Sequence, residues 1–391
     1  MEEYFEGWPL KLVTTETSNG GVDRYVVATR HIAAGETVFM ARPFAVAIKL
    51  IRQTCALCLR FQSSSSAPCH LPYRCDACEQ AYYCSHQHQE VDRAAHQLEC
   101  APLRRIKDSG SFLTSSLQAE LRMVLRIIRT QCLETFQTQE QNQVTEHTGE
   151  ADMRKPQYSD VQLLCSHRES RSLEQVKTYR QALKALVGAR EEDLPWSSHD
   201  LFSLLCQDTC NGFGIRSQGE DEGELFAYGL YPTASYFNHS CYPNICHIRQ
   251  DLVIPSLSKE SNDLAGGDGA DQLIEPGLRF IAIRPINKGS LVCLTYIDPS
   301  RPTEARREAL LCTYFFHCKC SRCEQRSTTR NNKRRNKHNQ PSAATQYTVD
   351  RLLCRNCNTN DKRDRPGLLY PLLSANSLRC NLCNTISLRS T

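Results

Sequence analysis

Cysteine spacing constrains the fold of this chain more than any other feature of its sequence. The 391 residues include 22 Cys and 12 His, and most of the Cys fall in short clusters that long stretches separate. A Cys-x2-Cys pair lets two thiolates reach one Zn²⁺ at about 2.3 Å, and a closed structural site needs four ligands. The clusters therefore predict zinc sites that are each assembled from two separate parts of the sequence.

The first cluster, over residues 55–100, offers enough ligands for two tetrahedral zinc sites. The series is Cys55, Cys58, Cys75, Cys78, Cys84, His88, His96 and Cys100. His86 competes with His88 for the sixth position, and Cys69 and His70, in the loop from Cys58 to Cys75, could be mistaken for ligands. Imidazole binds zinc as thiolate does, so a histidine at the sixth position is compatible with a metal site.

Two later clusters predict further metal binding. Cys318, Cys320 and Cys323 form a trio that is one ligand short of a closed site. Cys354, Cys357, Cys380 and Cys383 form two pairs that close a loop of 22 residues around one zinc. Eight scattered Cys are interpreted as small buried apolar residues: Cys69, Cys132, Cys165, Cys206, Cys210, Cys246, Cys293 and Cys312.

The remaining composition excludes several classes of protein. No apolar run approaches the roughly 20 residues that span a bilayer, and the acidic start of the sequence carries no secretory signal. We therefore expect a soluble protein in a reducing compartment, the cytoplasm and nucleus, where Cys bind metal rather than form disulfides. A net charge of +4 is too small to indicate nucleic-acid binding.

Two segments far apart in the sequence share one pattern of strand, glycine turn and strand. Ala28-x-Arg30-x-Ile32-x-x-Gly35 matches Ala282-x-Arg284-x-Ile286-x-x-Gly289. From the residues alone, these are either related hairpins or two unrelated ones.

Apolar residues between the two hairpins recur at helical spacing and predict three helices. The stripes are Leu117, Leu121, Val124, Leu125, Ile128 and Cys132; Val176, Tyr179, Leu183, Leu186 and Val187; and Leu201, Leu204 and Leu205. The third helix is expected to begin at Ser197, with Asp200 in a capping box. The polar stretch 137–160 predicts a linker or a long loop.

One short string is the most specific signal in the sequence. Asn238-His239-Ser240-Cys241-Tyr242-Pro243-Asn244 resembles the signature of SET-domain lysine methyltransferases. Tyr296 matches that family's terminal tyrosine, and Phe316-x-Cys318-x-Cys320-x-x-Cys323 matches its post-SET cysteine cluster. The end of the first zinc cluster is similar to the MYND finger, so residues 8–323 resemble the SET and MYND (SMYD) family.

The resemblance implies an α+β fold, in which small curled β-sheets of the SET domain are split by a MYND zinc finger and a helical insert. We expect the first SET part over 8–50, the finger over 55–100, the insert over 101–205 and the second SET part over 206–300. The post-SET segment follows over 301–323, a basic linker over 324–350 and the C-terminal zinc knuckle pair over 351–391.

The resemblance also implies how the ligands are shared among four zinc ions. The finger's first site takes Cys55, Cys58, Cys84 and His88, and its second takes Cys75, Cys78, His96 and Cys100. Cys241 completes the third site with Cys318, Cys320 and Cys323, which supplies the ligand that the trio lacks.

Roles for individual residues follow from the same resemblance. S-adenosylmethionine would be bound by Asn211, Asn238, His239, Phe316 and Arg24. Phe213 and Tyr314 would line the lysine channel, although Phe315 could replace Tyr314. Tyr296 would be the catalytic residue.

The implied activity is methyl transfer from S-adenosylmethionine to a lysine side chain of a protein substrate. One departure favours an alternative: Asp23-Arg24-Tyr25 stands where the family usually has Gly-x-Gly beside the cofactor. The alternative is a catalytically weak or inactive adaptor whose finger binds proline-rich peptides. Neither the target lysine nor the number of methyl groups follows from the sequence.

Overall fold

The computed structural model describes residues 2–16, 21–62, 70–110, 113–140, 154–187, 196–217, 223–254, 273–324, 351–358, 367–372 and 377–388. The chain divides into two compact units. The first comprises Met1–Ala41, Thr233–Ile248 and Leu278–Thr391, and the second comprises Arg42–Pro232 and Arg249–Gly277. Helices and small sheets occur together, which confirms the predicted α+β class.

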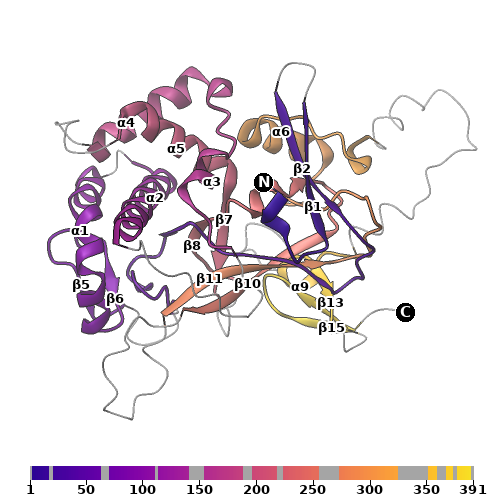
Figure 1. The fold of residues 1–391 in the computed structure, drawn as a ribbon, viewed down its shortest axis with the longest axis horizontal. Helices are drawn as coiled ribbons and strands as arrows, with labels where there is room; N and C mark the ends of the chain where they lie inside the picture. Colours follow the sequence, from indigo (N-terminus) through magenta and orange to yellow (C-terminus); the bar gives the residue numbers. More distant parts are fainter. Residues whose placement is uncertain are drawn as a thin grey trace, which may run out of the picture. The chain divides into compact units, whose positions relative to one another are not determined.

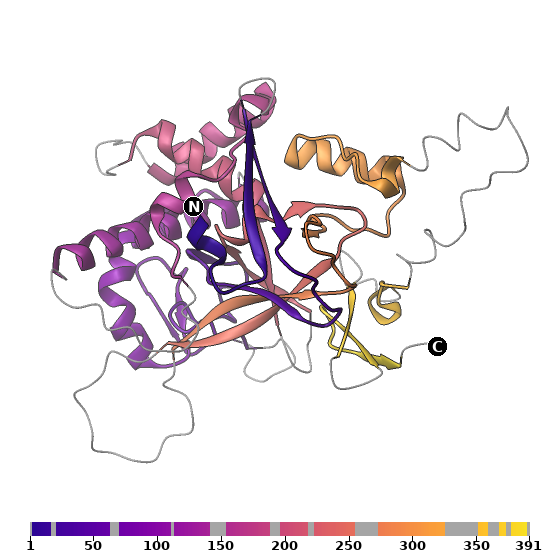
Figure 2. The same cartoon turned by 45° about the vertical axis from the view of Figure 1, so that its right-hand side comes forward.

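Strands of the first unit belong to small sheets of two or three strands (Figure 1). β1 (Leu10–Glu16) and β2 (Val22–Ala28) form an antiparallel hairpin, which Figure 2 shows in profile. β3 (Thr37–Ala41) is at one edge of a sheet with the order β10–β11–β3, where β10 is Ile245–Ile254 and β11 is Leu273–Ala282. β9 (Asn238–His239) pairs in parallel with β12 (Cys293–Leu294), so the signature string lies beside the residues that precede Tyr296.

The two similar hairpins pair with each other reciprocally. Ile32 and Ile286 exchange both of their backbone hydrogen bonds, each of 2.9 Å. Gly35 N–H donates to Ala282 O at 2.7 Å, and Gly289 N–H donates to Ala28 O at 2.8 Å. Matching residues of the two hairpins therefore make matching contacts: each isoleucine pairs with the other, and each glycine donates to the strand that precedes the other glycine. The repeat is one structural unit rather than two unrelated hairpins.

Four phenylalanine rings form a cluster in the core of the first unit: Phe5 of the 3-10 turn η1 (Glu2–Phe5), Phe39, Phe237 and Phe280. Neighbouring ring centroids are 4.9–6.2 Å apart, and the rings are tilted or edge-on. Because Phe237 immediately precedes Asn238, this cluster fixes where the signature string begins.

A three-stranded sheet and a group of helices make up most of the second unit. The sheet has the order β4–β8–β7, with β4 at Ala45–Ile48, β8 at Leu225–Leu230 and β7 at Gly212–Arg216. Two short strands, β5 (Tyr73–Arg74) and β6 (Tyr82–Tyr83), pair in the first cysteine cluster. The helices are α1 (His86–Asp108), α2 (Ser115–Glu140), α3 (Tyr158–Gln162), α4 (Leu173–Val187) and α5 (Ser198–Asn211), with a 3-10 turn η3 (Arg168–Ser170). Figure 1 shows α1, α2, α4 and α5 side by side.

The three predicted helices are confirmed as α2, α4 and α5. Ser197 caps α5, where its hydroxyl accepts the backbone N–H of Asp200 at 3.2 Å. The linker predicted over 137–160 is wrong at both ends, since 137–140 continue α2 and 158–160 begin α3. Its middle, 141–153, lies outside the described residues. None of the helices in the described ranges is both long and apolar enough to cross a membrane.

The chain after the SET strands forms α6 (Thr303–Tyr314) and then a small C-terminal module. The module contains α9 (Arg355–Asn358) and a sheet of three antiparallel strands, β13 (Leu369–Pro371), β14 (Ser377–Cys380) and β15 (Ile386–Leu388). Within the first unit, an apolar cluster packs this module against β10 and the end of β11: Leu353, Leu368 and Tyr370 pack with Cys246, Ile281 and Ile283. Most of the basic linker predicted over 324–350 lies outside the described residues.

The scattered cysteines differ in burial. Cys206, Cys246 and Cys293 are buried, as expected of small apolar residues, and Cys132 and Cys210 are half-buried. The prediction is wrong for Cys165 and Cys312, which are exposed because leaving one small thiol in solvent costs little. Cys69 lies outside the described residues.

Candidate functional site

In the part of the chain that the structure describes, sixteen Cys and His side chains gather in four groups, and these are the four ligand sets that the resemblance implies. Within each group, the ligand atoms all lie within 4.8 Å of one another. Facing sulfur atoms are 3.6–3.9 Å apart. Thiolates at a Zn–S distance of about 2.3 Å occupy tetrahedral corners about 3.8 Å apart. The donor sets therefore fit four zinc ions.

His88 rather than His86 completes the first site in the finger. Its Nδ1 is 3.6 Å from Cys55 Sγ and 3.0 Å from Cys84 Sγ. Ser85 caps the N-terminus of α1 by accepting the backbone N–H of His88, so the helix starts where this ligand is needed. His86 is exposed on the same helix and lies 3.6 Å from the carboxylate of Glu90.

A buried ion network supports the second site. His96 Nδ1, the ring atom that faces away from the metal group, is 3.6 Å from Glu99 Oε1. Glu99 in turn pairs with Arg126 at 3.1 Å and Arg129 at 3.0 Å, both from α2. Burial alone would raise the pKa of Glu99, but Arg126, His96 and Arg129 lower it to about 2. A carboxylate behind a ligating histidine fixes the ring's orientation.

Sequence reasoning missed this network, although a signal for it exists. Arg122, Arg126 and Arg129 recur at helical spacing on α2, and Asp92 and Glu99 are two turns apart on α1. Arg129 also pairs with Asp92, and both acids are 1% exposed. These ion pairs bind α1, which carries two ligands of the second site, to α2 of the helical insert.

The third metal group supports an aromatic cluster. Cys241, Cys318, Cys323 and Leu310 form a buried core, against which Tyr296, Tyr314 and Phe316 pack. A buried guanidinium lies beside the thiolates: Arg306 is 1% exposed, and one of its nitrogens is 3.7 Å from Cys323 Sγ. Arg306 is a second residue that sequence reasoning missed, since only the folded chain brings α6 next to the Cys groups.

Tyr296 is held by backbone and side-chain hydrogen bonds. Its hydroxyl donates to the carbonyl oxygen of Phe237 at 2.8 Å, and its backbone N–H donates to His239 Nδ1 at 3.0 Å. The ring centroid is 4.8 Å from that of Tyr314 and 5.3 Å from that of His239. Burial lowers the pKa of His239 to about 4, so its imidazole is neutral at neutral pH.

The Asp23-Arg24-Tyr25 segment lies beside the signature string. Asn238 is exposed, and its side-chain amide donates to Arg24 O at 3.2 Å. The Arg24 guanidinium stacks over the ring of Tyr236 in the 3-10 turn η5 (Ala234–Tyr236), 5.6 Å from the ring centroid. The backbone of Arg24 therefore meets the Asn-His pair although no glycine is present there.

Asn211 and Phe213 belong to the second unit, at the junction of α5 and β7. The side-chain amide of Asn211 donates to the carbonyls of Gln207 and Cys165 at 2.7 and 2.9 Å. The Phe213 ring is half-buried and meets the buried Tyr231 ring edge-on, with centroids 5.7 Å apart. In the described contacts, Asn211 stabilises the end of its own helix.

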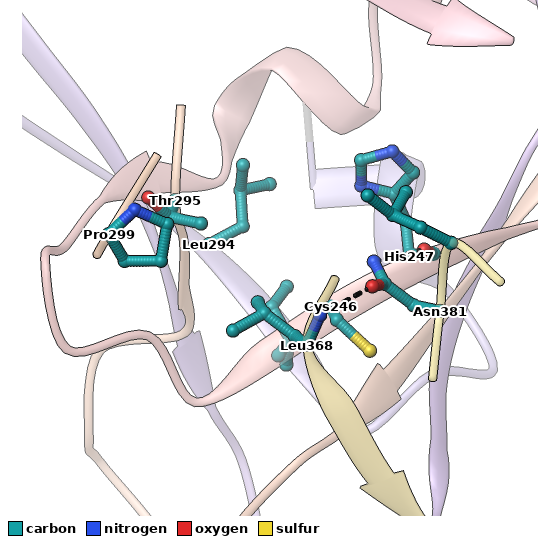
Figure 3. A pocket seen from close by; sticks show the side chains of 9 residues that line it. Cys246, His247, Leu294, Thr295, Pro299, Leu368 and Asn381 are labelled. Atoms are coloured by element: carbon teal, nitrogen blue, oxygen red, sulfur yellow. Dashed lines mark hydrogen bonds between the residues drawn. The ribbon is translucent and has the colours of Figure 1, made fainter. Parts of the chain in front are cut away.

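The fourth metal group fixes a turn that contacts the SET strands. Asn381 lies in the knuckle between two ligands, and its side-chain amide donates to the carbonyl of His247 in β10 at 3.1 Å. Figure 3 shows this contact at a cavity of about 20 Å³, room for about one water. Leu294 and Thr295 line the opposite side, so the module reaches the residues directly before Tyr296.

Comparison with known proteins gives the same assignment as the motifs. A family model of the SET domain matches residues 23–297, more than half of the chain. A solved structure of the SET domain of LSMT, bound to lysine and AdoHcy, covers 80% of this chain with 11% identity and a TM-score of 0.31. At that similarity the family model, not the solved structure, carries the assignment.

Three curated relatives illustrate the similarity. A SET and MYND domain-containing protein of Dictyostelium discoideum is 24% identical over 352 residues, which are 82% of this chain and 61% of the relative. N-lysine methyltransferase SMYD2-A of Danio rerio is 26% identical over 316 residues, 78% of this chain and 59% of the relative. Histone-lysine N-methyltransferase ASHR2 of Arabidopsis thaliana is 26% identical over 323 residues, 78% and 70% of the two chains. The chain thus spans about three fifths of the first two relatives.

Proposed function

Because the chain belongs to the SET domain family, in its SET and MYND branch, we propose that it methylates lysine side chains of a protein substrate. S-adenosylmethionine, when bound, supplies the methyl group on a sulfonium sulfur. Histones and other proteins both remain candidate substrates. Thiolate zinc sites need reduced cysteines, so the proposal also places the protein in the cytoplasm and nucleus.

The hydrogen bonding of Tyr296 is the observation that supports the activity most. A phenol has one proton to donate, and Tyr296 commits it to the carbonyl of Phe237 at 2.8 Å. The lone pairs of the hydroxyl oxygen are then oriented to accept. An incoming neutral amine can donate one N–H to that oxygen, which turns the nitrogen lone pair toward the methyl group. This is catalysis by positioning, which requires no strong base.

The remaining chemical requirement is a neutral amine. Free lysine has a pKa near 10.4, so a channel that disfavours the ammonium form is needed. The half-buried rings of Tyr296 and Tyr314, 4.8 Å apart, supply apolar walls on the first unit. We assign Tyr314 to the channel on this ground and on the family resemblance, and Phe213 on the resemblance alone.

The residues around Asn238 fit a nucleoside sulfonium ligand. The exposed amide of Asn238 is a polar contact, and the ring of Phe316, 6.0 Å from that of His239, offers a face for stacking. We propose that Asn238, Phe316 and the backbone of His239 and Arg24 bind S-adenosylmethionine. Asn211 joins this set by resemblance alone.

An adaptor function is the second candidate, and the Asp23-Arg24-Tyr25 segment is the feature that favours it. Bulky side chains stand where a glycine loop would let a cofactor approach the backbone closely, and the Arg24 guanidinium lies over the Tyr236 ring. On this alternative, the finger would bind proline-rich peptides and the SET domain would be inactive.

One experiment separates the two candidates. Full-length, zinc-loaded protein is titrated with S-adenosylmethionine by calorimetry and then incubated with labelled S-adenosylmethionine and mixed histones or lysine-containing protein fractions. Binding together with label on lysine supports the enzyme. An absence of S-adenosylmethionine binding contradicts it and leaves the adaptor, which titration with a proline-rich peptide then tests.

A further inference from the structure

The side chain of His239 spans the distance between the third metal group and Tyr296. Its Nε2 is 3.2 Å from Cys241 Sγ, and its Nδ1 is 3.0 Å from the backbone nitrogen of Tyr296. Both ring nitrogens are therefore occupied by partners from different parts of the chain, within one structural unit.

The partners fix which ring nitrogen carries the proton. A backbone N–H can only donate, so Nδ1 of His239 must accept from Tyr296. The single proton of a neutral imidazole is then on Nε2, where it points at Cys241 Sγ. A metal-bound thiolate carries negative charge, so this is a charge-assisted hydrogen bond.

The backbone on either side of His239 is also tied to the strand that leads to Tyr296. His239 is opposite Leu294 in the parallel β9–β12 pair, and Ser240 N–H donates to Leu294 O at 2.8 Å. These contacts stop two residues before Tyr296. The hydrogen bond from Tyr296 N–H to the His239 imidazole follows them along the strand, and it holds the backbone from which the tyrosine side chain projects.

We propose that His239 is a positioning residue, which uses the zinc-bound thiolate of Cys241 as an anchor to hold Tyr296 in place for methyl transfer. The inference rests on the proposed function and extends it, because it makes turnover depend on the third zinc through one side chain. In the proposed cofactor site His239 takes part through its backbone rather than its side chain, so cofactor affinity should respond much less than turnover does.

Two substitutions each keep one end of the connection. In His239→Asn, the amide oxygen can occupy the position of Nδ1 and accept from Tyr296, but nothing reaches Cys241. In His239→Gln, the amide nitrogen can occupy the position of Nε2 and donate to Cys241, but the bond to Tyr296 is lost. We expect kcat to fall roughly 10- to 100-fold in both, the usual cost of removing a group that orients a metal ligand or a reacting residue.

The metal end has a readout that does not need activity. Cobalt replaces zinc in the purified protein, and its thiolate charge-transfer bands respond to hydrogen bonds on sulfur. We expect a shift of these bands in His239→Asn but not in His239→Gln, with four metals bound and S-adenosylmethionine affinity within a few-fold of wild type in both. His31→Asn, an exposed histidine in the same unit, is the control.

The outcomes that overturn the proposal are distinct. Unchanged kcat in both variants removes the positioning role, and an unshifted cobalt spectrum in His239→Asn removes the anchor. An equal loss of cofactor affinity and kcat would instead place the His239 side chain in cofactor binding. If wild type transfers no methyl group while the spectrum of His239→Asn still shifts, the proposed function fails and the His239–Cys241 bond stands.

Discussion

At the scale of single residues, the hydroxyl of Tyr296 is the atom on which the proposed chemistry depends most. Tyr296→Phe keeps the ring against Tyr314 and His239 but removes the oxygen that would orient the amine. Turnover should fall by roughly 10²–10³, as is common when one pre-organised polar contact is lost in a dry site. S-adenosylmethionine affinity should change little. Steady-state kinetics and calorimetry on the same preparation measure both, with the exposed Tyr73→Phe as control.

Two other results would lead to different interpretations of Tyr296. Near-normal turnover would remove the hydroxyl from the mechanism. A collapse of turnover and cofactor affinity together would mean that its bond to Phe237 is structural.

The guanidinium of Arg306 should stabilise the third zinc site. Four thiolates around Zn²⁺ leave a net charge of −2, and Arg306 is the buried cation next to Cys323. Arg306→Met keeps most of the side-chain volume but removes this charge. We expect zinc affinity at one of the four sites to fall roughly 10- to 100-fold. Release of zinc to a coloured chelator should show one fast ion among four, while exposed Arg301→Met should release zinc like wild type.

Residues differ in how far the sequence predicts them. The ligand pairs could be predicted because two thiolates that share a metal must lie a few residues apart, and the family pattern supplied Cys241 and the pairing. Arg306 and Glu99 could not be predicted, since a charged residue can be expected in the core only when the residue that pairs with it is known. Their partners, Cys323 and Arg126, lie 17 and 27 residues away and become neighbours only after folding.

At the scale of elements, the reciprocal hairpins depend on two glycine turns. Gly289 has φ +79°, a left-handed conformation, and a Cβ added there would meet nothing within 4 Å. Gly289→Ala should therefore destabilise the protein through backbone strain alone, by about 1–2 kcal/mol. The urea midpoint of the change in tryptophan fluorescence measures this, with Lys288→Ala on the same turn as control. Equal midpoints in the two variants would contradict the argument.

The spacing of apolar residues predicted the helices that bury an apolar face, and it missed α1, where the first buried residues are polar or charged. α2, α4 and α5 carry the expected apolar stripes, whereas α1 buries His88, Asp92, His96 and Glu99. Zinc ligation and ion pairs hold those residues inside, so no hydrophobic pattern marks the first half of the helix, and apolar burial begins only with Leu103 and Ile106. The hairpin repeat was visible in the sequence, but the mutual pairing of Ile32 and Ile286 is a contact across 254 residues that no local signal specifies.

At the scale of the whole molecule, four metal sites in the described residues each join separate parts of the sequence. We expect four zinc ions per chain, because sixteen ligands form four closed sets. Metal binding supplies folding free energy where a site does not exist in the unfolded chain. Elemental analysis of purified protein that finds two zinc ions or fewer would contradict this assignment.

The third and fourth sites should differ in what their loss does to function. Cys241→Ser removes the anchor of His239 and the support beneath Tyr314 and Phe316. It should cost one zinc, weaken S-adenosylmethionine binding and abolish most turnover. Cys383→Ser should also cost one zinc, but its ligand set contacts β10 through Asn381 and the apolar cluster around Leu368, away from Tyr314 and Phe316.

Cys241→Ser and Cys383→Ser are directly comparable, because each replaces one thiolate in a site of four buried or half-buried cysteines. For Cys383→Ser we expect cofactor affinity close to wild type, easier proteolysis within residues 351–391, and a modest loss of turnover from the loosened wall behind Leu294 and Thr295. Calorimetry with S-adenosylmethionine, zinc analysis and limited trypsin digestion on both variants test this. Equal losses of cofactor affinity would mean that both metals support the fold as a whole, and that the third site has no special connection to the cofactor.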